Sequence, residues 1–132
     1  MDNLLIQDTV KTPLIDFDYS TGIMLIKGRS IPQDAELFWE PILKWFYAYS
    51  SNPCSKTKFI FEFEYFNISS SKRVLFLLYK MAEMHENGHE ILVQWICQEG
   101  DPDMVEVGND YASIVNVPFE IVDAMQPNLV SL

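Results

Sequence analysis

The sequence predicts an α/β protein with a single mixed β-sheet, in which an N-terminal antiparallel hairpin precedes alternating helices and strands. Two short apolar segments flank a polar turn near the N-terminus. After them, stretches of helical periodicity alternate with stretches rich in aromatic and β-branched residues. Strands joined by helices pair in parallel through right-handed crossovers, so the expected order is β-β-α-β-α-β-α-β. No repeat or long linker divides the chain, which predicts one domain over residues 1–132 with a core at about 12–122.

The hairpin and the first helix come from the N-terminal third. Leu14–Phe17 and Ile23–Ile26 are the two hairpin strands, because Asp18–Gly22 has the polar residues and the glycine of a tight turn. A helix is expected from about Ile31 to Tyr49, since Ser30 and Gln33 match a capping box and apolar residues then recur at helical spacing. Pro41 lies inside this helix and predicts a kink near residues 37–40.

The clearest strand and the clearest helix follow. In the strand Phe59–Tyr65, every second residue is aromatic, which places these four side chains, Tyr65 included, on one face and Ile60, Glu62 and Glu64 on the other. The helix Ser69–Asn87 carries an apolar stripe, and Gly88 stands where a left-handed C-cap belongs. The remaining elements are a strand at Glu90–Cys97, a helix at Met104–Val115 and a strand at Pro118–Val122, with fraying expected from about Gln126.

Composition excludes several classes of partner. The chain has 19 acidic and 9 basic side chains, a formal charge of -10, which repels nucleic acids and anionic lipid surfaces. Cys54 and Cys97 have no metal-binding spacing and are too few for a disulfide framework. No signal-peptide pattern and no apolar run of membrane length occur. We therefore expect a cytoplasmic protein without a membrane partner, whose oligomeric state the sequence does not determine.

The segment from Tyr65 to Lys72 has the most direct functional meaning, because it places three adjacent serines where a strand ends and a helix begins. One interpretation is N-capping, which Asn67 or a serine could perform. The other is a phosphate site, since a helix N-terminus favours anions and Ser69–Ser71 provides more hydroxyls than capping requires. Lys72 and Arg73 follow, and they either pair with such a phosphate or remain solvated.

A second polar cluster and the absence of catalytic motifs complete the survey. The segment Glu99–Asp110 holds five carboxylates, but their spacing does not match an EF-hand. It is interpreted first as a solvated loop with helix N-terminal acids, second as a partner-facing patch, and last as a metal site. A metal-assisted hydrolase using Asp101, Asp103 and Glu106 is the least favoured function. The sequence has no nucleophile elbow, phosphate-binding loop or zinc-protease motif, which predicts a protein that is not an enzyme.

Six short segments stand out when the chain is taken in order: Thr12–Pro13, Gly28–Ser30 with Pro32, Trp45 with Tyr49, Glu64–Lys72, Val93–Trp95 and Glu106–Asp110. In this order they resemble the SiaC family of bacterial regulatory phosphoproteins. The resemblance extends from about Thr12 to Ile121 and is most specific in Tyr65–Lys72. The family is similar in fold to STAS domains and anti-sigma-factor antagonists, in agreement with the element order above.

The resemblance implies a switch without a cofactor. A kinase phosphorylates a hydroxyl at the strand-to-helix junction, a PP2C-type phosphatase removes the phosphate, and the unmodified protein binds and activates a diguanylate cyclase. In the family the residue after the asparagine is usually a threonine, and it is the phosphoacceptor. Here that residue is Ile68, which has no hydroxyl. Either the modification has moved to Ser69 or Ser70, or this member does not switch in that way.

Together these points predict a non-enzymatic, protein-binding regulatory domain that reversible phosphorylation switches. Ser69 is the preferred acceptor, because it is the hydroxyl nearest to position 68, and Ser70 is the second candidate. The alternative is a constitutive interaction module of the same fold. The predicted partner-binding surface comprises Arg29, Asn67, Ile68, Ser71, Lys72 and Arg73.

Overall fold

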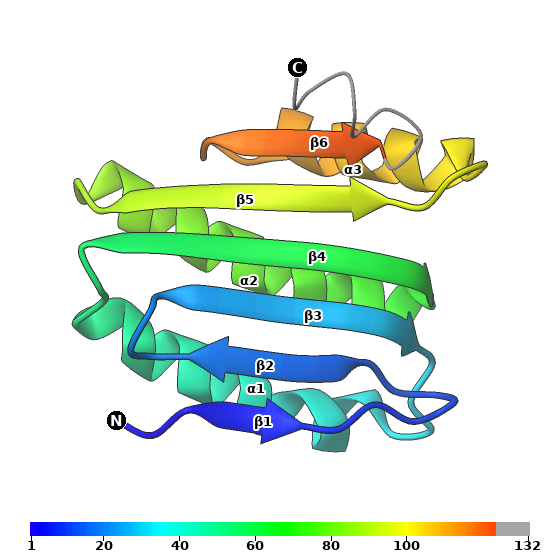
Figure 1. The fold of residues 1–132 in the computed structure, drawn as a ribbon, viewed down its shortest axis with the longest axis horizontal. Coiled ribbons are helices and arrows are strands. Elements are labelled where there is room, and N and C mark those ends of the chain that lie inside the picture. The colour runs from blue at the N-terminus through cyan, green and yellow to red at the C-terminus, as the bar shows by residue number, and fades with distance from the viewer. Residues whose placement is uncertain (124–132) are drawn as a thin grey trace.

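The computed structural model describes residues 1–123. Within them, one six-stranded sheet is covered by three helices (Figure 1). The strands follow one another across the sheet in chain order. The pairs β1–β2 and β2–β3 are antiparallel, whereas the pairs β3–β4, β4–β5 and β5–β6 are parallel. The elements are β1 (Leu4–Ile6), β2 (Leu14–Asp18), β3 (Ile23–Ser30), α1 (Ala35–Ser51), β4 (Lys56–Phe66), α2 (Ile68–Glu86), β5 (Glu90–Cys97), α3 (Pro102–Ile114) and β6 (Phe119–Asp123).

The predicted fold class is confirmed, with one strand more than expected. β1 pairs with β2 in antiparallel register, Leu4 opposite Phe17, and starts the sheet well before residue 12. Three residues are too few to show a periodicity, so the strand was not predicted. Its flanks are held by tertiary hydrogen bonds, from Trp45 Nε1 to the carbonyl of Asp2 (2.7 Å) and from the Tyr19 amide to Asn3 Oδ1 (2.8 Å).

Helix α1 begins later than the sequence suggested. Asp34 is the N-cap, and its carboxylate accepts a hydrogen bond from the Leu37 amide (3.0 Å). Ser30 is instead the last residue of β3 and is completely buried, so the predicted capping box of Ser30 and Gln33 is wrong. Pro41 lies within α1 and does not end it, while the kink expected there stays a prediction.

A bulge changes the face on which the end of β4 presents its side chains. Gly28 lies opposite Phe63, but the next residue, Arg29, lies opposite Tyr65, so one residue of β4 is extra. Tyr65 is consequently 51% exposed, and the prediction that it shares one face with the buried Phe61 and Phe63 is wrong. Phe66 takes the inward position, with its ring centroid 4.7 Å from that of Phe63.

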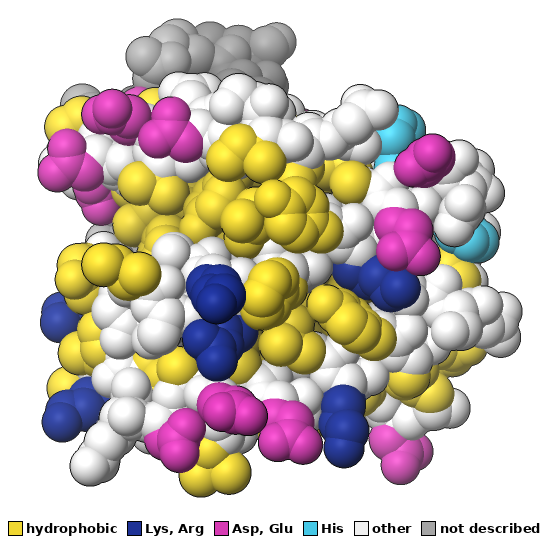
Figure 2. Space-filling view, turned by 180° about the vertical axis from the view of Figure 1, so that it is seen from behind, with side chains coloured by type: hydrophobic (Ala, Val, Ile, Leu, Met, Phe, Trp, Pro, Cys, Tyr) yellow, Lys and Arg dark blue, Asp and Glu magenta, His cyan; other side chains and the backbone are white. Residues whose placement is uncertain are grey.

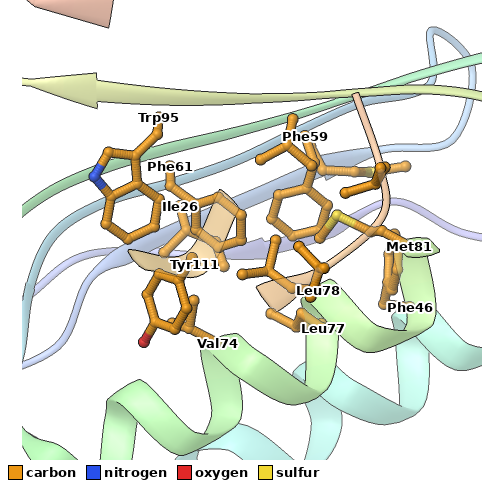
Figure 3. Close-up of a cluster of buried hydrophobic side chains, with 14 of the residues drawn as sticks. Ile26, Phe46, Phe59, Phe61, Val74, Leu77, Leu78, Met81, Trp95 and Tyr111 are labelled. Carbon is orange, nitrogen blue, oxygen red and sulfur yellow. The ribbon is translucent and has the colours of Figure 1, made fainter. Parts of the chain in front are cut away.

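The core lies between the sheet and the helices, which all cover the same face of the sheet (Figures 1 and 3). Aromatic side chains from β4 and β5 pack against the apolar stripe of α2. Gly88 follows α2 with a positive φ of 92°, as its predicted C-cap role requires. This packing fixes α2 across the sheet and places its first residue next to the ends of β3 and β4. The fraying predicted from Gln126 lies outside the described residues.

Candidate functional site

The candidate site is the junction where β4 ends and α2 begins. β3 and β4 are parallel, so Ser30 and Phe66 end their strands at the same edge of the sheet. The amide of Asn67 donates a hydrogen bond to the Ser30 carbonyl (3.0 Å). The end of β3 and the first turn of α2 thus become one surface, although about forty residues separate them.

Asn67, and no serine, caps α2. Its backbone is extended (φ -84°, ψ 175°), and its Oδ1 accepts from the Ser70 amide (2.9 Å). Its carbonyl accepts from the Ser71 amide (2.9 Å). The bond to the Ser71 amide is the first intrahelical bond of α2, and the bond to the Ser70 amide satisfies one of the amides that every helix start leaves free. Capping does not require the serine hydroxyls.

Ser70 forms a buried hydroxyl pair with Ser30. Its Oγ lies 2.7 Å from Ser30 Oγ and donates to the Ser30 carbonyl (3.1 Å). Both side chains are completely buried. Because the one proton of Ser70 points to that carbonyl, the Ser30 hydroxyl donates in the shorter contact. In this conformation the Ser70 hydroxyl is not accessible to another protein.

Ser69 lies at the surface of the junction. It is half-buried, and its Oγ donates to Asn67 Oδ1 (3.1 Å). Its carbonyl accepts from Arg73 Nη1 (3.1 Å), one helical turn later. An open depression of about 1040 Å³ adjoins Ser69 and Arg73, and the first turn of α1, including Asp34, forms its other side. A phosphate here would lie near one guanidinium and across from one carboxylate.

Ser71 connects the junction to α3. Its Oγ donates to the Ile68 carbonyl (2.8 Å), and its own carbonyl accepts from the Tyr111 hydroxyl (3.0 Å). Burial raises the pKa of Tyr111 to about 12, so this hydroxyl stays a donor at neutral pH. The contact holds the first turn of α2 against α3.

The other predicted surface residues also lie at this junction. Ile68 occupies the first helical position with 89% of its side chain exposed, and Lys72 is exposed. Arg29 is exposed beside Tyr65. The structure therefore brings together all eight residues predicted for the site. What the sequence did not reveal is the contact of Ser70 with Ser30, because no local pattern pairs two serines so far apart.

The first carboxylates of the acidic segment Glu99–Asp110 have a structural role at the start of α3. Asp101 is the N-cap of α3, and its carboxylate accepts from the Met104 amide (3.1 Å). Asp103 follows in the first turn of the helix, where a carboxylate complements the helix dipole, and Glu106 is exposed. Within residues 1–123, no three His, Cys, Asp or Glu side chains converge closely enough to hold a metal ion.

A family model described as the SiaC family of regulatory phosphoproteins matches residues 6–124. The chain belongs to the SiaC family. Solved SiaC structures of Pseudomonas aeruginosa share this fold, one with a TM-score of 0.85 at 22% identity, covering 93% of this chain and 99% of that one. A structure of the diguanylate cyclase SiaD in complex with its activator SiaC, from the same species, matches with a TM-score of 0.87 at 22% identity, covering 91% of this chain and 98% of that one.

An uncharacterized protein of Pseudomonas aeruginosa strain UCBPP-PA14 is also similar, with 22% identity over 121 residues, which are 92% of this chain and 96% of that protein. At this identity the solved structures show the shared fold. The SiaC fold places Ile68 at the first position of α2, directly after the capping asparagine. Across the described part of the chain, no helix is both long and apolar enough to cross a membrane.

Proposed function

We propose that this SiaC-family protein is a non-enzymatic, cytoplasmic regulator that binds a protein partner at the start of α2, and that phosphorylation of Ser69 controls this binding. The different environments of the three serines support the choice of Ser69. Ser70 is buried against Ser30, and Ser71 is bonded to the helix backbone. Ser69 borders the open depression next to Arg73.

The electrostatic environment of Ser69 suits a phosphate. A phosphoserine carries about -1.5 to -2 charges at neutral pH. At a helix N-terminus a negative charge gains about 0.3–1 kcal/mol from the helix dipole. Arg73 lies one turn away and can pair with the phosphate, whereas Asp34 across the depression repels it. The modified helix therefore stays folded, while the charge of the surface beside Ile68 changes.

Partners are inferred from the family. SiaC of Pseudomonas aeruginosa is described as the activator of the diguanylate cyclase SiaD and forms a complex with it. We infer that the unmodified form of this chain likewise binds a diguanylate cyclase. A kinase would add the phosphate and a PP2C-type phosphatase would remove it.

Mass mapping of the protein isolated from its host tests the proposal. We expect one phosphate within the peptide Tyr65–Arg73, carried by Ser69. Ser69→Ala should abolish it, and Ser71→Ala, the matched control in the same turn, should leave it unchanged. An unmodified peptide after co-expression with the cognate kinase and ATP would reject the switch.

A constitutive binding module is the second candidate, and the exposure of Ile68 favours it. An apolar side chain that is 89% exposed at the helix start suits a permanent contact surface. Affinity for the partner separates the two functions. If wild type, Ser69→Ala and Ser69→Asp bind equally well, the module is constitutive. If only Ser69→Asp loses affinity, binding is switched.

A further inference from the structure

None of the helices in residues 1–123 covers the front face of the sheet in Figure 1, which we call the open face. Figure 2 shows the opposite side of the molecule, where the helices lie. Parallel strands are usually covered on both faces. β3, β4, β5 and β6 are parallel to one another, yet the helices cover a single face of them. The open face is therefore a candidate contact surface.

Apolar side chains lie at the centre of the open face. Ile60 of β4 alternates with buried phenylalanines and points to this side. Leu25 of β3 lies opposite Ile60, and Leu92 and Ile96 of β5 face the same way. Ile23 of β3 is 43% exposed there. An apolar patch with charged side chains around it is typical of a protein contact surface.

The charged side chains of β4 change sign along the open face. Lys56 and Lys58 precede Ile60, whereas Glu62 and Glu64 follow it. A depression of about 340 Å³ adjoins the two glutamates toward the end of the strand. Along the strand, this side of β4 is therefore basic, then apolar, then acidic.

These charges are only partly neutralised within the chain. Lys58 and Glu64 have no ion pair among residues 1–123. Lys56 Nζ lies 3.7 Å from Glu90, but both side chains are exposed, and such pairs contribute little to stability. Glu62 pairs with a lysine of β3 (3.6 Å). The two lysines at one end of β4 and Glu64 at the other can therefore pair with a second molecule.

We infer that the open face binds a second copy of this chain, with the two sheets face to face and the two β4 strands antiparallel. A twofold axis that passes between the sheets at Ile60, perpendicular to β4, brings Lys56 of each protomer opposite Glu64 of the other. The apolar centres then cover each other. A twofold contact requires a patch that is complementary to itself, and the order of charges along β4 meets this requirement.

The interface should be small and reversible. With about 4.8 Å between strands and about 3.3 Å per residue, the six-stranded sheet offers roughly 600 Å² per protomer. A total of about 1,200 Å² lies at the lower limit of specific interfaces. The formal charge of -10 on each chain adds repulsion. We therefore expect dimers to form at micromolar or higher protein concentrations.

The helix-covered sides face outward in such a dimer. Ser69 adjoins the depression at the first turn of α1, on the helix side of the sheet, so both copies of it stay accessible. Two partner sites would be held together and would bind an oligomeric partner more strongly, a consequence that rests on the proposed function. The dimer itself does not depend on that function.

Sedimentation velocity of the full-length chain tests the open-face dimer. Over protein concentrations of about 1–500 µM, the weight-average sedimentation coefficient should rise from the monomer value toward the dimer value. Lys56→Glu should raise the dissociation constant at least about tenfold, because the substitution acts at two symmetric points. Lys44→Glu of α1 is the matched control, since the Lys44 side chain is 78% exposed against 79% for Lys56 and forms a similar ion pair with Glu40 (3.6 Å). Its effect on the dissociation constant should be within about twofold.

Exchanging the two charges separates a direct contact from a general effect of charge. Glu64→Lys alone should weaken the dimer at least about tenfold, although it makes the chain less negative, whereas Lys56→Glu/Glu64→Lys should return the dissociation constant to within about threefold of wild type. Thermal unfolding verifies that the variants are equally well folded. A chain that stays monomeric over the whole concentration range overturns the dimer, and so does a double variant that is as weak as Lys56→Glu. Neither result affects the assignment of Ser69, which mass mapping tests separately.

Discussion

At the scale of single residues, three adjacent serines have three different roles. Ser70 is completely buried and bonded to Ser30, Ser71 donates to the Ile68 carbonyl, and Ser69 donates to the capping asparagine. The sequence places all three serines at a helix start, and no local pattern distinguishes their roles. Their positions around the helix decide which one faces the core and which one faces the depression.

Stability measurements should distinguish Ser69 from Ser70. We expect Ser70→Ala to lower the free energy of unfolding by about 1–3 kcal/mol, because it leaves the buried Ser30 hydroxyl unpaired. Ser69→Ala, which removes a half-buried hydroxyl, should change it by less than about 0.5 kcal/mol. In urea titrations, the double variant Ser30→Ala/Ser70→Ala should cost less than the sum of the two single variants. Equal effects of Ser69→Ala and Ser70→Ala would contradict the buried pair.

Position 68 offers a gain-of-function experiment. Ile68 is 89% exposed at the first position of α2, so Ile68→Thr should leave stability within about 0.5 kcal/mol of wild type. With the cognate kinase and ATP, the variant should accept a phosphate at position 68, where the family usually has its acceptor. Ile68→Val, of similar shape but without a hydroxyl, is the control. Phosphopeptide sequencing reads the site, and an unmodified position 68 would show that the kinase recognises a different geometry.

At the scale of elements, contacts between helices and sheet determine where the site lies. The bulge in β4 turns Phe66 inward, and Tyr111 of α3 bonds to the first turn of α2. Gly108 lets α3 approach β5 closely, because a Cβ at this position would lie 2.4 Å from Trp95 Cδ1. Contacts with both β4 and α3 therefore fix the position of the junction.

Gly108→Ala tests this close approach. In a free helix the substitution would stabilise by about 1 kcal/mol through helix propensity. Here the new methyl group overlaps the buried Trp95 ring, and overpacking costs about 1–3 kcal/mol. We therefore expect a net loss of stability and a lower melting temperature by differential scanning calorimetry. Asn109→Ala, at an exposed neighbouring position of α3, is the control and should be neutral or stabilising. If Gly108→Ala gives the same result, α3 and β5 are less tightly packed than the structure shows.

At the scale of the whole molecule, the helices cover one face of the sheet and bury titratable groups from different elements (Figure 1). Burial, with smaller contributions from Asp101 and Asp123, raises the pKa of Cys97 in β5 from 9.0 to about 11. Burial raises the pKa of Tyr111 in α3 from 10.0 to about 12. Both groups are neutral when protonated, and both bind their proton more tightly in the folded protein than in the unfolded chain.

Stability should consequently fall at alkaline pH. A group whose pKa is higher in the folded protein than in the unfolded chain stabilises the fold. This stabilisation is fully present at pH values below the unfolded-state pKa, and it is lost as the pH rises through the folded-state pKa. For Cys97 and Tyr111 this window extends from about pH 9 to about pH 12. Urea titrations across this range should show a steep decrease. Tyr111→Phe should be about 1 kcal/mol less stable at pH 7, having lost its hydrogen bond to Ser71, but should decline less steeply between pH 10 and pH 12.

The sequence by itself determined the order of the long elements, the place of the strand-to-helix junction and the family. These depend on periodicity, caps and short motifs, which are set by residues a few positions apart. Only the tertiary structure decided the short strand β1, the outward turn of Tyr65 and the burial of Ser70. Each of these depends on sheet register or helix packing between distant segments. Such contacts form only when the chain folds around a common core, and no local pattern records them.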